Sequence, residues 1–374
     1  MNTLSSIFWL GTKELRTLLG SVALMGFLVY SFTFSIYQQA TGGSETVNRA
    51  SVAFVDEDRS TLSRRLRDAL YPPYFKSPEL IEADEIDEAM DASRFMFVIV
   101  VPPHFESDVR SGRSPEVQLN VDATAVRQAA LGTGYIQAIL STEINRFMSR
   151  SDTVAVQPVT LVKRKAFNPN GTQSWLRAVS GLLDQLSMLT IILTGSAILR
   201  EREHGTIEHL LVMPLNSFEI ALSKVWANGL VILVVFVLSM RFIVEGAIGV
   251  PFAGSRMLLL TGTVIYLFAA AAIGILLATI ARSMAQFGLL CMITIMPMMM
   301  LSGGMSPLES QPDWLQHITW FLPSRQFMSF SQSIIFRGAG FDNVWPEFTA
   351  MAGLGLAFFL TSLVLFRRSI RVSQ

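Results

Sequence analysis

Residues 257–301 read MLLLTGTVIYLFAAAAIGILLATI-ARS-MAQFGLLCMITIMPMMML, and Arg282 is the only charged side chain among them. A helix needs about 20 predominantly apolar residues to cross the hydrocarbon core of a bilayer. Residues 257–280 and 284–301 meet this need, and only residues 281–283 separate them. The stretch therefore predicts two membrane-spanning helices joined by a very short turn, with a kink tolerated at Pro297.

Four more apolar runs lie outside this stretch, at residues 18–37, 175–199, 226–244 and 348–366. The 374-residue chain is 51% hydrophobic and 16% charged, with a mean hydropathy of +0.44. An ordinary soluble protein is about 25% charged. These observations predict an α-helical integral membrane protein with six transmembrane helices.

The flanks of the runs predict the orientation, because short cytoplasmic segments carry an excess of Lys and Arg. With the N-terminus inside, nine basic residues flank the inner side and five flank the outer side. We therefore expect both termini, residues 1–17 and 367–374, to be cytoplasmic. Residues 6–19 place Ile7, Leu10, Leu15 and Leu18 at helical spacing, which predicts an amphipathic helix along the inner membrane surface. A cleaved signal peptide is the alternative for the first run, but residues 37–40 lack a small-x-small site.

The polar segment 40–170 is expected to be an inserted, extracytoplasmic α/β domain. Strands are predicted at 51–55, 95–101, 116–121 and 154–162, and helices at 60–71, 84–92, 103–111 and 124–149, with Ser60 as a cap. The segment holds 18 of the 29 acidic residues. A metal site is conceivable there, but a solvated outer face is favoured because no ordered ligand spacing accompanies the acids.

Catalytic signatures are absent from the sequence. There is no Gly-x-x-x-x-Gly-Lys-Ser/Thr loop to cradle nucleotide phosphates, and the four histidines are scattered. Cys291 is the only cysteine and is expected to be a small buried hydrophobe. The formal net charge is zero, so nothing indicates nucleic-acid binding. We expect no enzyme activity, metal or cofactor on this chain.

The loop 200–217 is the most informative polar segment. Residues 199–214 read LREREHGTIEHLLVMP, in which Gly205 breaks one helix and Thr206 can cap the next. Pro214 ends that short helix, and Ser217 is expected to cap the third span. A rigid charged helix on the cytoplasmic face is suited to receiving force from a soluble partner. An ordinary charged loop is the alternative, but it does not explain the interleaved acids.

Residues 202–214 resemble the Arg-Glu-x-Gly-Thr-x-Glu-x-Leu-Leu-x-x-Pro signature of export-type ABC transporter permeases, the drug and polysaccharide exporter family, with His204 at the variable position. Residues 301–307, LSGGMSP, and 336–340, FRGAG, are similar to the outer re-entrant region of that family. Residues 56–58, DED, with 99–105, IVVPPHF, resemble the subgroup that has a large domain after the first span. The pattern is most similar to enterobacterial permeases that accompany a fused ABC ATPase and a periplasmic adaptor.

The resemblance implies a transmembrane permease in the bacterial inner membrane that exports an unidentified cargo. ATP and Mg would bind a separate ABC ATPase, a second permease chain would complete the pathway, and a periplasmic adaptor is a further partner. Residues 302–346 would form an outer re-entrant region. The residues expected to couple to the ATPase are Glu201, Arg202, Glu203, Thr206 and Glu208.

Polar side chains in the second span are the candidates for lining the pathway. Charged residues inside a membrane usually face a cavity or a partner. Asp184 could line the pathway, pair with Arg177, or be wetted near the outer end. The pathway-lining set is Asp184, Gln185, Thr190 and Thr194. The methionines of the fifth span are expected to face lipid, and a flexible apolar lining for hydrophobic cargo is the alternative.

Three other classes of membrane protein fit less well. A receptor would need a cytoplasmic output module, whereas only about 17 residues precede the first span and about 8 follow the last. A secondary transporter would need ion-binding carboxylates in several spans, and a membrane transferase would need a catalytic constellation.

Overall fold

The computed structural model describes residues 3–42, 49–92, 94–122, 126–149, 172–203, 216–304, 308 and 311–372. The chain divides into two compact units, a helical unit (Met1–Gly43 with Lys165–Gln374) and a sheet unit (Ser44–Arg164). The predicted strand at 154–162, and the predicted helix breaks and caps at Gly205, Thr206 and Pro214, lie outside the described residues.

The chain begins with helix α1 (Thr3–Gly20), followed by α2 (Val22–Tyr30), a π-helical segment (Ser31–Ser35) and α3 (Ile36–Thr41). The axis bends by 77° between Thr3–Gly20 and Val22–Thr41. Ser21 adopts an extended backbone at the bend, with φ −87° and ψ 98°. Helix α1, which we call the leader helix, covers the predicted amphipathic helix at residues 6–19 and runs past the predicted N-terminal segment 1–17 to Gly20. The helical segments of the first span continue to Thr41 rather than residue 37.

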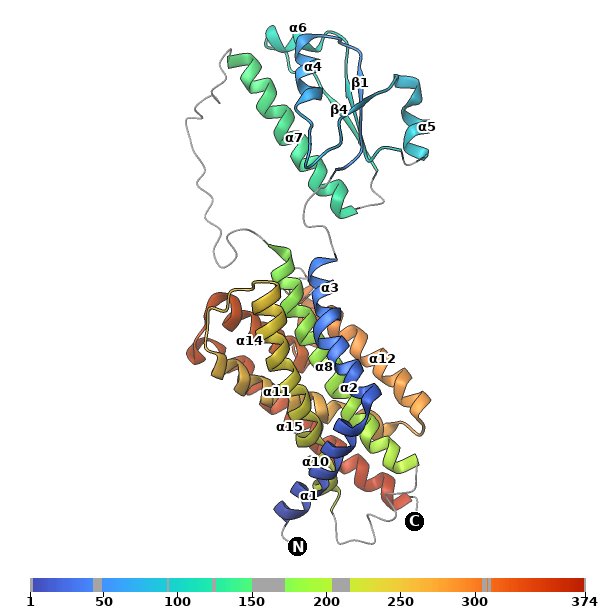
Figure 1. Cartoon of the computed structure of the whole chain (residues 1–374), viewed down its shortest axis with the longest axis vertical. Coiled ribbons are helices and arrows are strands. Elements are labelled where there is room, and N and C mark those ends of the chain that lie inside the picture. The colour runs from blue at the N-terminus through green and yellow to red at the C-terminus, as the bar shows by residue number, and fades with distance from the viewer. Residues whose placement is uncertain are drawn as a thin grey trace. The chain divides into compact units, whose positions relative to one another are not determined.

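Within the described ranges, five further helices are long and apolar enough to cross a membrane, and the bent pair makes six if counted as one span. They are α8 (Gln173–Glu203), α10 (Ser217–Ser239) with its π-helical extension Met240–Ala247, α11 (Arg256–Ile280), α12 (Met284–Leu301) and α15 (Phe341–Val372). Each contains one predicted apolar run. Figure 1 shows the start of α1 and the end of α15 at the same end of the helical unit.

Two of these helices begin well before the predicted runs. Helix α10 starts at Ser217 rather than residue 226, because two charged side chains in its first turns have partners: Glu219 accepts the Asn216 N–H (2.9 Å) and Lys224 is ion-paired. Asn216, not Ser217, occupies the cap position. Helix α15 starts at Phe341 rather than residue 348 and continues to Val372, through most of the predicted tail.

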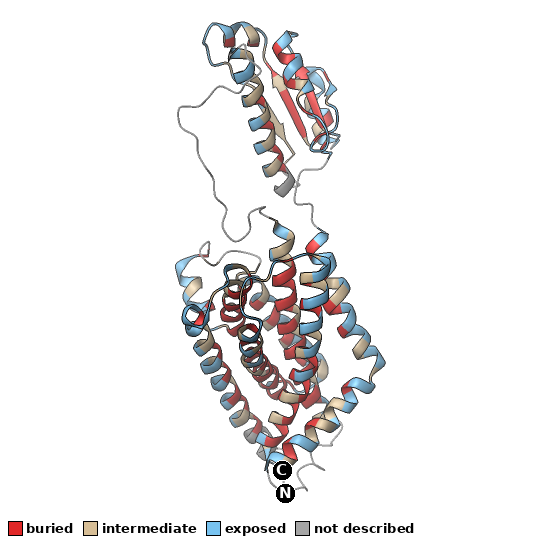
Figure 2. Ribbon diagram, turned by 60° about the vertical axis from the view of Figure 1, so that its left-hand side comes forward, coloured by how far each residue is buried: buried red, intermediate tan, exposed pale blue. Residues whose placement is uncertain are grey.

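Helices α8 and α11 form the centre of the helical unit. Over the most apolar 18 residues of each helix, 78% are buried in α8 and 72% in α11, against 22% in α12 and 22% in α15. Figure 2 shows buried helices at the centre of the helical unit and more exposed helices around them. The exposed side chains of α12 include Met292, Met296 and Met300. Their contact with lipid stays a prediction. Met298 instead packs into the core at 4% exposure.

The backbones of α8 and α11 nearly touch where they cross. A Cβ atom built on Gly274 would lie 2.4 Å from the Ile191 carbonyl oxygen, and one built on Gly195 would lie 2.6 Å from the Gly274 carbonyl oxygen. Small residues allow this close approach between helices in a membrane. The two glycines therefore set the spacing of the two central helices.

Two shorter helices fall in the predicted re-entrant region 302–346, namely α13 (Asp313–Thr319) and α14 (Pro323–Arg337). Helix α14 packs into the core through Phe327, Phe330 and Ile334. The Phe327 ring stacks on Tyr266 of α11, with centroids 4.1 Å apart and planes at 5°. The side of the membrane on which these helices lie stays a prediction.

The sheet unit contains a four-stranded sheet of order β2-β1-β3-β4. Strand β1 (Val52–Asp56) pairs in parallel with β2 (Glu79–Leu80) and β3 (Phe97–Val101), and β4 (Gln118–Val121) is antiparallel to β3. Strands β1, β3 and β4 lie on three predicted strands. The short β2 was not predicted, because it lies at the start of an acidic run with no apolar pattern.

Helices cover both faces of this sheet. Val52 and Phe54 pack in one core with α4 (Thr61–Asp68), α6 (Phe105–Arg110) and α7 (Val126–Ser149). Ala53 and Val55 point to the opposite face and pack against α5 (Ile86–Asp91). This alternation follows from the two-residue period of a strand. Ser60 caps α4 as predicted, with its Oγ accepting the Ser63 N–H at 3.0 Å.

Candidate functional site

Three consecutive residues end α8, and each contacts a different part of the helical unit. We call Glu201, Arg202 and Glu203, together with their partners, the α8 junction. Residues 204–215, which connect α8 to α10, follow it directly and lie outside the described residues. The α8 junction is therefore the described part of the bundle that precedes this connection directly.

Glu201 joins α8 to α10 and, through Lys224, to α1. The Lys224 Nζ lies 2.8 Å from Glu201 Oε1 and 3.2 Å from Glu14 Oε2. The Lys224 side chain is only 3% exposed, and those of Glu14 and Glu201 are 15% and 21% exposed. Breaking a buried ion pair by removing one partner costs about 3–5 kcal/mol, because a charge is left uncompensated. The three groups therefore hold three helices together.

Arg202 binds the end of α11. Its Nη1 donates to the carbonyl oxygens of Thr279 (3.4 Å) and Ala281 (3.1 Å). The last carbonyl groups of a helix have no partner within the helix and carry partial negative charge. A guanidinium at this position satisfies them and is attracted by the helix dipole.

Glu203 binds the start of α12, the helix that follows α11 along the chain. Its Oε1 accepts the backbone N–H of Met284, the first residue of α12, at 2.7 Å. A carboxylate is favoured there because the first N–H groups of a helix are unpaired and carry partial positive charge. Arg202 and Glu203 thus hold the two sides of the 281–283 turn.

Helix α1 is fastened to α10 beside the junction. The Trp226 Nε1 donates to the Ile7 carbonyl at 3.2 Å, and the Trp226 ring stacks on Phe8 with planes at 5°. A Cβ built on Gly11 would lie 2.1 Å from that ring, so only glycine fits. Ile7, Gly11 and Glu14 share one face of α1. This face packs against protein, while Leu4 and Trp9 stay exposed.

The structure brings together only part of the site predicted for ATPase coupling. Glu201, Arg202 and Glu203 lie in one junction, whereas Thr206 and Glu208 lie outside the described residues. Sequence reasoning missed Lys224 and Glu14 as members. The available signal was a lysine followed directly by a long apolar run, which indicates a charge that needs a partner.

The polar residues predicted to line the pathway all lie on α8. Asp184 is buried, with 7% of its surface exposed. Gln185 donates to Ser35 Oγ at 3.2 Å, and Thr190 donates to the Leu186 carbonyl at 2.6 Å. Thr194 is fully buried. The role of these four residues is taken up below.

One turn from Asp184, α8 carries a buried polar contact with α11. The Tyr266 hydroxyl donates to Ser187 Oγ at 2.6 Å, and Ser187 donates to the Leu183 carbonyl at 2.7 Å. Asp184 and Ser187 are three residues apart and so share a helix face. This face points toward the centre of the helical unit.

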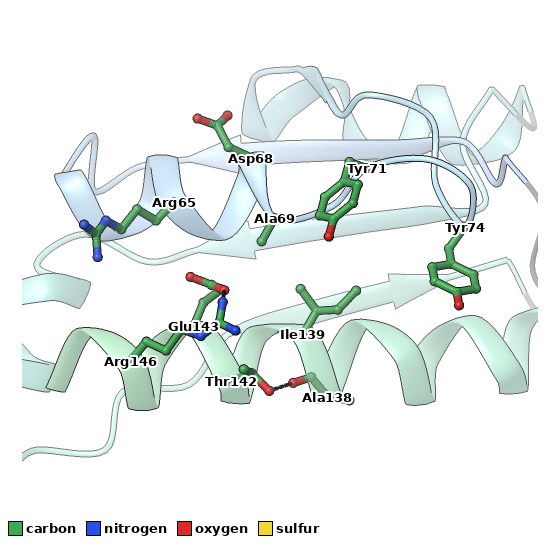
Figure 3. Close-up of a pocket in the computed structure, with 10 residues that line it drawn as sticks. All are labelled: Arg65, Asp68, Ala69, Tyr71, Tyr74, Ala138, Ile139, Thr142, Glu143 and Arg146. Atoms are coloured by element: carbon green, nitrogen blue, oxygen red, sulfur yellow. Dashed lines mark hydrogen bonds and ion pairs between the residues drawn. The ribbon is translucent and has the colours of Figure 1, made fainter. Parts of the chain in front are cut away.

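A groove of about 620 Å³ runs between α4 and α7 of the sheet unit (Figure 3). The rings of Tyr71 and Tyr74 lie on the α4 side, and Ile139 and Glu143 project from α7. No residue of the predicted site lines the groove. In the described part of the chain no three His, Cys, Asp or Glu side chains are grouped to hold a metal ion.

Comparison with known proteins agrees with this architecture. The family model described as ABC-2 family transporter protein matches residues 16–364. The chain is 47% identical to the inner membrane transport permease YhhJ of Escherichia coli over 370 residues, covering 99% of both chains. It is 26% identical to the probable multidrug ABC transporter permease YbhR of E. coli over 361 residues, covering 96% of this chain and 97% of the relative. This chain therefore belongs to the ABC-2 family of transporter proteins.

Proposed function

We propose that this permease is the membrane subunit of an ATP-driven exporter of the bacterial inner membrane, working with an ABC ATPase on a separate chain. The observation that carries the proposal is the α8 junction. Glu201, Arg202 and Glu203 fasten the helix before residues 204–215 to α10 and α1, to the end of α11 and to the start of α12.

Force applied at residues 204–215 would reach the bundle in two ways. Covalently, it would act on the end of α8 and the start of α10. Through Arg202 and Glu203, it would act on both sides of the 281–283 turn, and so on the central helix α11 and the peripheral helix α12. Thr206 and Glu208, within that connection, are proposed to contact the ATPase directly.

Further partners follow from the same proposal. ATP and Mg would bind the ATPase, a second permease chain would complete the pathway, and a periplasmic adaptor would contact the sheet unit, which we place outside the cytoplasm. The relatives support this setting, since one is named an inner membrane transport permease and another a probable multidrug ABC transporter permease. The cargo is left open.

Affinity purification from the native membrane tests the assignment. We expect the tagged permease to retain an ABC ATPase, in a complex that hydrolyses ATP. Replacing Thr206 with alanine and Glu208 with glutamine, the two residues proposed to contact the ATPase, is expected to reduce the ATPase recovered, whereas Glu85→Gln with Glu88→Gln in the sheet unit should not. Recovery of the permease without any ATPase would contradict the proposal.

Cysteine labelling tests the orientation. In a variant with Cys291 replaced by alanine, a single cysteine is introduced at position 88 or at position 203. Glu88 and Glu203 are both exposed in the structure, so a label can reach either position. A membrane-impermeant maleimide added to intact spheroplasts should label Glu88→Cys and leave Glu203→Cys unlabelled until the membrane is opened. The reverse pattern would place the α8 junction outside the cell and remove it from any cytoplasmic ATPase.

Asp184, Gln185, Thr190 and Thr194 are proposed to line the export pathway. Asp184 supports this best, because it is buried, and an ionised carboxylate inside a membrane costs about 2.5–3.5 kcal/mol and is usually kept for function. We expect Asp184→Asn to keep the ATPase bound and to lower export-linked ATP hydrolysis roughly tenfold, within the usual range of coupling between sites. Ser180→Ala, one turn away, is the control, and equal effects of the two variants would argue against a role for the charge.

A further inference from the structure

Among the ion pairs of the described residues, Lys224 is the group that contacts both α1 and α8. It lies in the second turn of α10, and its ammonium pairs with Glu14 of α1 and Glu201 of α8. An ammonium that is 97% shielded from water is costly unless carboxylates compensate it. Two carboxylates from two other helices do so here.

The neighbouring contacts show that α1 is held along one face. Trp226 secures Ile7 and Gly11, and one turn further along α1 Lys224 secures Glu14. The first contact is largely apolar, and packed helices can slide by small amounts on such surfaces. The contact between Lys224 and Glu14 is an ion pair that is largely shielded from water, where charge interactions are strong.

We propose that Lys224 is a positioning residue that makes α1 and the last turn of α8 move as one unit. The proposal rests on the proposed function, in which an ATPase moves α8. A shift of α8 moves Glu201, Lys224 follows its counter-ion, and Glu14 carries α1 with it. The leader helix is then displaced together with the end of α8, although residues 21–200 separate the two in sequence.

Spin labels on the permease–ATPase complex measure this directly. With Cys291 replaced by alanine, labels at Thr17 and Arg200 report the distance between α1 and α8, and labels at Thr17 and Asp342 report α1 against the start of α15. All three labelled sites are exposed. Distances are recorded without nucleotide and after trapping with ATP and vanadate. We expect the Thr17–Arg200 distance to stay constant and the Thr17–Asp342 distance to change.

Lys224→Met keeps most of the side-chain volume and removes the charge. In this variant the Thr17–Arg200 distances should spread and should differ between the two states, and ATP hydrolysis by the complex should fall roughly tenfold. Lys224→Arg should restore a constant distance. Lys13→Met, which removes an exposed lysine of α1, is the matched control and should behave as the parent.

The outcomes separate the inference from the function on which it rests. Absence of a bound ATPase, or of any nucleotide-dependent distance change, would overturn the proposed function. A working complex in which Lys224→Met keeps the parent's constant Thr17–Arg200 distance would overturn the inference alone. If Lys224→Met does not fold, Glu14→Gln removes only the α1 arm, and unchanged distances in that variant would equally overturn it.

Discussion

Gly274→Ala is expected to destabilise the permease by about 3 kcal/mol, although alanine is the better helix former. The added Cβ would lie 2.4 Å from the Ile191 carbonyl oxygen and 3.1 Å from its carbonyl carbon, both of them backbone atoms that no rotamer change can move. Helices α8 and α11 would have to separate where they cross. A fall in Tm on the order of 10 °C in detergent or nanodiscs would be the measured sign.

Gly288→Ala provides the matched control, because a Cβ at that position meets nothing within 4 Å. The same substitution should there be neutral or slightly stabilising, since alanine loses about 1 kcal/mol less than glycine on forming a helix. Gly195→Ala faces the same crossing from α8, so its effect should not add fully to that of Gly274→Ala. Equal Tm values for Gly274→Ala and Gly288→Ala would show that the backbones are further apart than described.

Glu203→Ala is expected to lower ATP hydrolysis by the permease–ATPase complex roughly tenfold while leaving the complex assembled. The substitution removes the acceptor of the Met284 N–H, and with it the described hydrogen bond from the end of α8 to the start of α12. Movement of the 204–215 connection would then act on α12 only indirectly. Vanadate-sensitive phosphate release in nanodiscs, normalised to bound ATPase, measures the effect.

Glu219→Ala separates this loss of connection from the loss of a helix cap. Glu219 also accepts an N–H at a helix start, that of Asn216 at 2.9 Å, but this contact lies within its own segment. Both variants should lose about 1 kcal/mol of stability. Only Glu203→Ala should lower hydrolysis more than about twofold, and equal losses would mean that capping alone explains the phenotype.

The positions of the membrane-length helices followed from composition and length. Residues 257–280 and 284–301 could not be shielded from water except by lipid or other helices, so their apolar runs specified the helices α11 and α12 almost to the residue. The β-branched and aromatic runs at residues 51–55 and 95–101 similarly indicated β1 and β3. Ser60 was identified as a cap because its hydroxyl can accept a local N–H.

Helix boundaries that depend on distant partners could not be predicted in this way. Glu219 and Lys224 made the start of α10 look too polar for a span, and only the tertiary structure supplies Glu14 and Glu201 as counter-ions from α1 and α8. The bend at Ser21 was missed for a related reason. An extended serine between two apolar stretches leaves no local signature.

The charged motif at the end of α8 marked the candidate site in the sequence, since interleaved acids and bases next to a span suggest a contact surface. Which group each side chain binds was decided by the fold alone. Arg202 and Glu203 are adjacent in the chain, yet they bind the end of one helix and the start of another. Hydrophobicity and helical period depend on a few neighbouring residues, so the sequence alone determines them. Charge pairing depends on which helices pack together. Close contacts such as that between Gly195 and Gly274 determine that packing.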